Sequence, residues 1–241
     1  MTESAPLRPW ALAAGVAMAA ALAMIFLYAP ADELQGDVQR IFYLHVPAAV
    51  AAFACFAVVV GAGAVQLWRG SLRADRLAEA SAEVGLLLTT VVLVMGSLWA
   101  KPIWGTYWTW DARLTSTLVL WLIYAGYFAV RRLSTSRRQA ARLSAVVGIL
   151  GFIDVPVVYF SVTWWRTLHP QPVISSGALA PAMMTALRVT VVAVALLAAV
   201  LVTARYRLRT IRDETEDLRE SSAAGRPAAD QPRQALGVDA R

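Results

Sequence analysis

The segment WGTYWTWDARLT at residues 104–115 places three tryptophans, a tyrosine, an aspartate and an arginine between two strongly apolar runs. Indole rings collect where lipid meets water, because the ring is apolar on its faces and carries a polar N–H group. A loop in water has little use for so many of them. The segment therefore predicts a platform at a membrane surface that suits a large flat ligand.

The composition of the chain agrees with a membrane location. Of 241 residues, 59% are hydrophobic and only 16% are charged, and the mean hydropathy is +0.56. Six apolar runs are each long enough to cross a hydrocarbon layer of roughly 30 Å, which takes about 17 to 25 helical residues. These runs lie at 10–28, 45–67, 83–100, 114–130, 143–163 and 182–204.

The expected fold is an all-α membrane bundle of about six transmembrane helices, formed by residues 1–204. The external tryptophan-rich segment of this domain spans 99–116. Residues 205–241 carry mixed charges and then an Ala/Pro/Gln/Gly-rich stretch, which predicts a cytoplasmic tail that is largely disordered after a short helical extension. We favour a retained first helix over a cleaved signal peptide, because the first apolar run is longer than a typical signal sequence and more spans follow.

The basic residues alternate between loops and so predict an orientation. One set of span ends carries thirteen arginines: Arg8, Arg69, Arg73, Arg76, Arg131, Arg132, Arg137, Arg138, Arg142, Arg205, Arg207, Arg209 and Arg212. The other set carries four basic residues: Arg40, Lys101, Arg113 and Arg166. Arginine-rich loops stay in the cytoplasm, so both termini are expected there and the tryptophan segment outside. The net charge of +6 then serves orientation and requires no nucleic acid.

No Walker motif, GxGxxG segment or soluble catalytic domain occurs between the spans. We therefore expect that the chain is not an ATPase and that any energy comes from a partner. The sequence favours a carrier or assembly factor over an independent enzyme.

The chain has only two histidines, His45 and His169, and the predicted topology places both on the outer side. His45 is expected just before the second helix, with Pro47 in the first turn of that helix, and His169 after the fifth span. Neutral imidazole ligates haem iron, and two histidines from separate helix ends can bind one iron from opposite faces. A histidine or a tryptophan alone is more simply interpreted as an anchor at the membrane interface.

The coincidence of these histidines with the indoles favours a ligand. Aromatic belts normally occupy both membrane interfaces, whereas seven of the nine tryptophans here share the outer side with the histidines. They are Trp99, Trp104, Trp108, Trp110, Trp164, Trp165 and, more marginally, Trp121.

The other two outer segments differ in predicted structure. In GDVQRIFYLH, residues Val38, Ile41, Phe42 and His45 recur at helical spacing, which predicts an interfacial helix. The segment 164–181 begins WWRTLHP and contains prolines at 170, 172 and 181, which argue against a helix through it.

Charged residues near or within the spans complete the candidate site. Asp111 is predicted to cap the fourth span, with a bond to Arg113, the orientation of a histidine or the positioning of a partner's loop as alternatives. Asp154 lies near the middle of the fifth span, where Pro156 would loosen the backbone. Arg188, in the outer part of the sixth span, has three possible roles: snorkelling, pairing with Asp154 or meeting a haem propionate. We hypothesise that Arg188 faces the site.

Three motifs together resemble one family. GDVQRIFYLHVPAA at 36–49, WGTYWTWDARLTS at 104–116 and SVTWWRTLHP at 161–170 are similar to the CcmC family of cytochrome c maturation. That family is a branch of the tryptophan-rich (WWD) haem-handling membrane proteins. The resemblance covers nearly the whole chain to about Ala204, although this chain has Asp154 where an asparagine is expected and Pro170 where glutamine commonly follows the histidine.

The resemblance implies a haem site and a set of partners. It implies that His45 and His169 are the axial ligands of a haem b carried as cargo, and that Trp104, Trp108, Trp110 and Asp111 belong to the external haem-binding domain. Arg113 and Arg188 complete our candidate haem-binding set. The implied partners are the periplasmic haem chaperone CcmE, the small subunit CcmD, the membrane subunit CcmB and the ATPase CcmA. The implied location is the bacterial inner membrane.

Three functions are compatible with these features, and the resemblance implies assistance to covalent haem attachment to the chaperone as the nearest approach to catalysis. The leading one is haem binding at the outer face and delivery to CcmE during c-type cytochrome biogenesis. A transmembrane b-type electron-transfer subunit is the first alternative. Moving electrons across a membrane usually requires haem at more than one depth, whereas the two histidines here are both expected on one side. A solute transporter is the second, for which Asp154 and Arg188 would be pathway charges. The absence of an evident internal repeat disfavours it.

Overall fold

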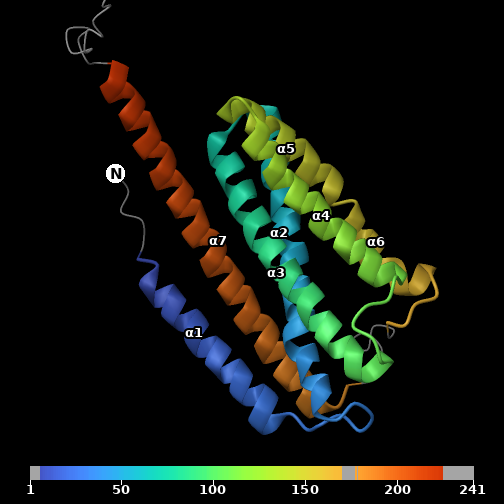
Figure 1. The fold of residues 1–241 in the computed structure, drawn as a ribbon. Helices are drawn as coiled ribbons and strands as arrows, with labels where there is room; N and C mark the ends of the chain where they lie inside the picture. The colour runs from blue at the N-terminus through green and yellow to red at the C-terminus, as the bar shows by residue number, and fades with distance from the viewer. Residues whose placement is uncertain (1–5, 170–176, 178, 225–241) are drawn as a thin grey trace, which may run out of the picture.

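The structure is a computed structural model that describes residues 6–169, 177 and 179–224. Long helices dominate it (Figure 1). They are α1 (Arg8–Ala23), α2 (Phe42–Arg69), α3 (Leu72–Trp104), α4 (Ala112–Leu133), α5 (Arg137–Gly151), α6 (Asp154–Trp164) and α7 (Pro181–Ala224). A π-helical turn (Met24–Tyr28) ends the first span, and a 3-10 helix (Asp37–Ile41) precedes α2.

Among the described residues, six segments are long and apolar enough to cross a membrane, which confirms the predicted all-helical fold. They are Arg8–Tyr28, Asp37–Arg69, Leu72–Trp104, Ala112–Leu133, Arg137–Trp164 and Pro181–Arg219. In the bundle, α2 and α3 lie at the centre, α1 packs along α7 on one side, and α4 packs against α5 and α6 on the other (Figure 1). We call the end with residues 99–111 and 164–169 the tryptophan end and the opposite one the arginine-rich end.

Small residues let the central helices approach closely. A Cβ atom on Gly148 of α5 would lie 2.6 Å from Cγ1 of Val59 in α2. A Cβ atom on Gly85 of α3 would lie 2.5 Å from Cε1 of Phe56, whose ring stacks on Tyr124 at 3.7 Å. Both glycines therefore occupy positions that a larger residue would force apart, as is common between membrane helices.

The fifth span is one apolar segment made of two helices. The helical hydrogen bonds tighten between α5 and α6, where Ile153 N–H donates to Leu150 O and Val155 N–H donates to Phe152 O. Pro156 has no N–H to offer Phe152 O, which accounts for the break. Asp154 begins α6 directly after it, and its buried Oδ2 atom has no hydrogen-bond partner among the described residues.

A network of charges closes the arginine-rich end. Arg131 of α4 donates to Oδ1 of Asp75 at 2.7 Å, Oδ2 of Asp75 at 2.9 Å, Oε2 of Glu79 at 2.8 Å and the hydroxyl of Ser144 at 2.8 Å. The side chains of Arg131 and Asp75 are only 12% and 5% exposed, respectively. Since a buried charge without partners is costly, this cluster ties α3, α4 and α5 together.

The last helix extends the same network. Arg209 of α7 pairs with Glu79 and with Glu83, and Arg205 reaches Glu83 at 2.5 Å. One carboxylate of α7, Asp213, pairs with both Arg76 and Arg137. Ion pairs therefore join α7 to α3 and α5, and within the described bundle they do so only at the arginine-rich end.

Two expectations about helix boundaries need correction. The segment from Asp37 does not form a separate interfacial helix, because its 3-10 turn continues directly into α2. His45 therefore lies inside the first turn of α2 instead of before it, and Pro47 lies in the following turn. Arg40 supports this junction by donating to the carbonyls of Ile25 and Ala29 at the end of the first span.

Helix α7 is longer than the sixth apolar run and continues past the C-terminal end of that run. Its 44 residues span about 66 Å at the α-helical rise, and the helix extends beyond its neighbours at the arginine-rich end (Figure 1). The predicted short helical extension thus reaches Ala224, and the rest of the predicted tail, 225–241, lies outside the described residues. Pro170 and Pro172 lie outside them too, whereas Pro181 begins α7.

Candidate functional site

The end of α3, the start of α4, the end of α6 and the loops beside them build the tryptophan end. Helix α3 stops at Trp104 because Gly105 takes a left-handed conformation, φ +77°, and donates its N–H to Lys101 O. Residues 105–110 then cross to Asp111, which begins α4. Helix α6 ends at Trp164, and residues 165–169 return the chain to the same end.

His45 lies in the first turn of α2 against α3. Its ring meets the indole of Trp99 edge-on, with centroids 5.9 Å apart. A Cβ atom on Gly96 would lie 3.0 Å from Cε1 of His45, so glycine leaves the room that the imidazole occupies. The Nδ1 atom of His45 is buried and has no hydrogen-bond partner in the described part of the chain.

His169 lies in the loop after α6. Its ring meets Trp104 edge-on at 5.3 Å, and its backbone N–H donates to the hydroxyl of Thr167 at 3.1 Å. Its Nδ1 atom is buried and lies 3.8 Å from Oδ2 of Asp111, which is longer than a hydrogen bond. With a side chain 20% exposed, the imidazole stays accessible from one side.

Asp111 performs two structural tasks. As predicted, it caps α4: Oδ1 accepts the N–H of Leu114 at 2.9 Å. Its Oδ2 atom accepts the hydroxyl of Thr167 at 2.9 Å. Burial alone would raise the pKa of Asp111, but the neighbouring His169 and the donors Leu114 and Thr167 outweigh it and lower the pKa to about 2. The carboxylate is therefore ionised at any physiological pH.

The two histidines come from different segments of the chain, His45 from the first turn of α2 and His169 from the loop after α6. Each contacts a tryptophan of α3 at this end, His45 through Trp99 and His169 through Trp104. The structure therefore brings together His45, His169 and Asp111 from three separate segments of the sequence.

The tryptophans form a surface beside these histidines. Trp108 and Trp110 meet edge-on at 5.6 Å, and Trp110 is 77% exposed. The Nε1 atom of Trp108 is buried and lacks a hydrogen-bond partner among the described residues. Trp164 stacks on Phe160 at 5.3 Å.

Trp121 belongs to the interior of the fourth span. It is the tenth residue of α4, and its Nε1–H donates to the hydroxyl of Thr90 at 2.8 Å. Six tryptophans, and not seven, therefore gather at the tryptophan end. They are Trp99, Trp104, Trp108, Trp110, Trp164 and Trp165.

The two candidate arginines occupy different environments. Arg113 crosses from α4 to α6, where it donates to the carbonyls of Val158 and Tyr159 at 3.3 and 2.8 Å and to the hydroxyl of Ser161 at 3.3 Å. Arg188 is exposed on α7, and within the described residues it forms neither a hydrogen bond nor an ion pair, Asp154 included.

Three contributors to the site were missed by sequence reasoning. Thr167 links Asp111 to the backbone of His169, Gly96 accommodates His45, and Gln35 accepts the indole N–H of Trp99 at 2.9 Å. Thr167 and Gly96 carry no distinctive pattern in a single sequence. Gln35 precedes a motif that had already been singled out, so a search for polar partners of the indoles would have reached it.

The donor set fits a haem. Iron-bound imidazole usually donates its second ring N–H to a carboxylate or carbonyl, and Nδ1 of His169 already points toward Asp111. That arrangement leaves Nε2 of His169 for a metal. The unpartnered Nδ1 of His45 and indole N–H of Trp108 are further polar atoms without a function in the described fold.

Within the described residues, a bundle of six candidate spans with two histidines and six tryptophans at one end defines a multi-span membrane protein with an aromatic, histidine-bearing surface. The family described as heme exporter protein C, CcmC, matches residues 1–221. The chain belongs to this family.

Similar proteins occur in bacteria and mitochondria. Heme exporter protein C of Escherichia coli (strain K12) is 38% identical over 200 residues, covering 83% of this chain and 82% of the relative. That of Bradyrhizobium diazoefficiens is 38% identical over 220 residues, covering 90% and 83%. A ccmC-like mitochondrial protein of Marchantia polymorpha is 37% identical over 147 residues, covering 61% and 62%.

Proposed function

We propose that this protein binds haem at the outer face of the bacterial cytoplasmic membrane and delivers it to the periplasmic chaperone CcmE during c-type cytochrome biogenesis. The observation that carries the proposal is that His45 in α2 and His169 in the loop after α6 each contact a tryptophan of α3 at the same end of the bundle. Membership of the heme exporter protein C family supports the same cargo.

In this proposal the two imidazoles bind the iron from opposite sides. Paired histidines fill both axial positions and so limit the reaction of the iron with oxygen. Asp111 would orient His169 and favour the tautomer in which Nδ1 carries the proton once these two groups, 3.8 Å apart here, close to hydrogen-bond distance. His45 is held by Gly96 and Trp99 of α3, so its position depends on helix packing.

The indoles are proposed to cover the macrocycle. Trp104 already contacts His169, while Trp108 and Trp110 continue the surface toward solvent. Because Trp110 is exposed, a haem lying against it would keep an edge open to a chaperone. Arg188 and Arg113 are the candidate propionate partners, and Arg188 has the freer guanidinium among the described residues.

The proposed assembly includes partners that supply what this chain lacks. Because no nucleotide-binding motif occurs in the sequence, ATP hydrolysis is assigned to CcmA, acting with CcmB and CcmD. The covalent bond to haem is assigned to a histidine of CcmE.

The test is the absorption spectrum of the full chain, purified in detergent after expression with the other maturation components. We expect a low-spin six-coordinate haem in the wild type that is lost or converted in both His45→Ala and His169→Ala. Trp104→Phe should weaken haem retention, whereas the matched control Trp68→Phe, an 82% exposed indole at the opposite end, should not. A wild-type protein without haem, even with CcmE present, would overturn the proposal.

A further inference from the structure

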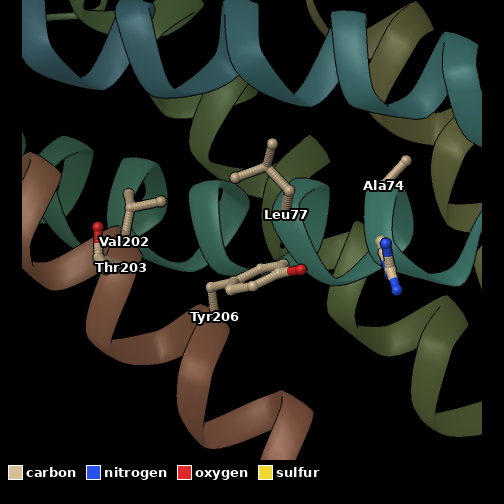
Figure 2. A pocket seen from close by; sticks show the side chains of 6 residues that line it. Ala74, Leu77, Val202, Thr203 and Tyr206 are labelled. Carbon is tan, nitrogen blue, oxygen red and sulfur yellow. The ribbon is translucent and has the colours of Figure 1, made fainter. Parts of the chain in front are cut away.

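A second candidate site lies at the arginine-rich end, in a groove between α3 and α7 (Figure 2). The groove has a volume of about 350 Å³, within the range of roughly 300 to 1,000 Å³ that is usual for small-molecule sites. Its lining residues are Arg73, Ala74 and Leu77 of α3 and Val202, Thr203 and Tyr206 of α7.

The groove is mostly apolar, with Arg73 and the hydroxyl of Tyr206 toward its outer end. Helix α3 runs inward from the arginine-rich end, so Leu77 lies about one turn deeper than Arg73. Helix α7 runs outward, so Val202 lies about one turn deeper than Tyr206. The ring of Tyr206 extends from α7 toward the turn of α3 that carries Ala74 and Leu77 (Figure 2). The small side chain of Ala74 leaves space there.

The polar end holds groups without protein partners. Arg73 is exposed and forms no hydrogen bond or ion pair with the rest of the described chain. One turn away, Arg76 pairs with Asp213 at 2.7 Å and donates to the hydroxyl of Thr210 at 3.2 Å. The hydroxyl of Tyr206 likewise makes no bond to another described residue. The groove thus combines a free cation and a free hydroxyl above apolar walls.

We propose that this groove binds an anionic phospholipid of the cytoplasmic leaflet. The lipid phosphate would meet Arg73 and the hydroxyl of Tyr206, while an acyl chain lies against Leu77 and Val202. Basic pockets between membrane helices on the cytoplasmic side are suited to such head groups, and that leaflet is the anionic one. A partner helix is the weaker occupant, because an apolar helix would leave the charge of Arg73 without a counterion.

Native mass spectrometry of the full chain in detergent tests this site. We expect phosphatidylglycerol to be retained in preference to phosphatidylcholine, and Arg73→Gln to weaken its retention about fivefold, which corresponds to about 1 kcal/mol for one basic residue near the surface. Arg73→Lys should keep the preference. The matched control is Arg132→Gln, an exposed arginine at the same end of the bundle that does not line the groove.

Two further measurements identify the ligand. Lysophosphatidylglycerol should compete with the lipid, whereas glycerol 3-phosphate should not, because it lacks the acyl chain. Ala74→Phe, which fills the groove, should reduce retention while leaving Arg73 in place. Equal retention by the wild type, Arg73→Gln and Ala74→Phe would overturn the proposal. Displacement of the lipid upon copurification with the other membrane subunits would also overturn it and assign the groove to a partner helix.

Discussion

The Oδ2 atom of Asp111 lies 3.8 Å from the Nδ1 atom of His169, at the point where the loop after α6 meets the start of α4. The same oxygen accepts the hydroxyl of Thr167, which in turn accepts the backbone N–H of His169. One carboxylate therefore fixes both the loop that carries the histidine and the surroundings of its ring. A movement of about 1 Å would complete a carboxylate–histidine pair of the kind that orients metal ligands.

The first prediction follows from that pair. Asp111→Asn should keep α4 intact, because asparagine caps helices as well as aspartate does, yet weaken haem retention by about 10-fold to 100-fold. The low-spin spectrum of haem titrated into the detergent-purified protein measures this. Glu33→Gln, an exposed carboxylate on the same side of the bundle, is the control. A normal spectrum and normal retention in Asp111→Asn would rule out the orienting role.

The second prediction concerns pH. The pKa of Asp111 in the folded protein is about 2, below its ordinary value of about 3.9. A depressed carboxyl pKa stabilises the fold above the unfolded value, so this contribution is complete above about pH 4 and is lost as pH falls toward 2. Thermal unfolding should therefore show a smaller loss of stability in Asp111→Asn than in the wild type across this interval. Parallel profiles would contradict the assignment.

The third prediction addresses the buried ion pairs. Arg131→Gln removes the ion-pair partner of the buried Asp75 and leaves Glu79 with Arg209, and it should destabilise the bundle by about 3 to 5 kcal/mol. The neighbouring Arg132 is exposed, so Arg132→Gln should change stability little. Unfolding in detergent distinguishes them. Adding Asp75→Asn to Arg131→Gln should recover part of the loss, and the absence of any recovery would mean that charge is not the cause.

The fourth prediction concerns helix packing. Gly148→Ala places a Cβ atom 2.6 Å from Cγ1 of Val59 and should cost about 1 to 3 kcal/mol. Gly126→Ala meets nothing within 4 Å and should be neutral or mildly stabilising. Thermal melting compares the two variants. Because the clash is with Val59, the double variant Gly148→Ala with Val59→Ala should melt closer to the wild type than Gly148→Ala alone.

The fifth prediction separates the two arginines. Arg113→Gln removes hydrogen bonds to α6 and should lower thermal stability as well as haem retention. Arg188→Gln removes an exposed side chain and should lower haem content and delivery to CcmE with little change in stability. Unchanged haem content and delivery in Arg188→Gln would remove this residue from the site.

The spans and the Asp111 cap were predictable because each depends on local signals. Apolar length fixes a transmembrane helix, and an aspartate before an apolar run fixes a cap. The register of the second span was less accessible. No helix breaker separates Asp37 from α2, so the helix begins earlier than the apolar run and takes His45 into its first turn.

The contacts within the site could not be predicted, because they join residues far apart in the sequence. Nothing near Thr167 indicates that its hydroxyl meets Asp111, 56 positions away. The arginine-rich loops predicted orientation, but not that Arg131 would be buried among carboxylates of α3. Pairing between helices depends on how the spans pack, and one sequence does not state that arrangement.

The ion pairs of α7 also impose an order on biosynthesis. Glu83 enters the membrane with α3, whereas its partner Arg209 is synthesised 126 residues later. Until Asp213 has been synthesised, Arg76 of α3 lacks this ion-pair partner. Glu79 of α3 likewise lacks Arg209 until that residue has been synthesised. The nascent bundle therefore cannot reach its final stability until the last helix is inserted.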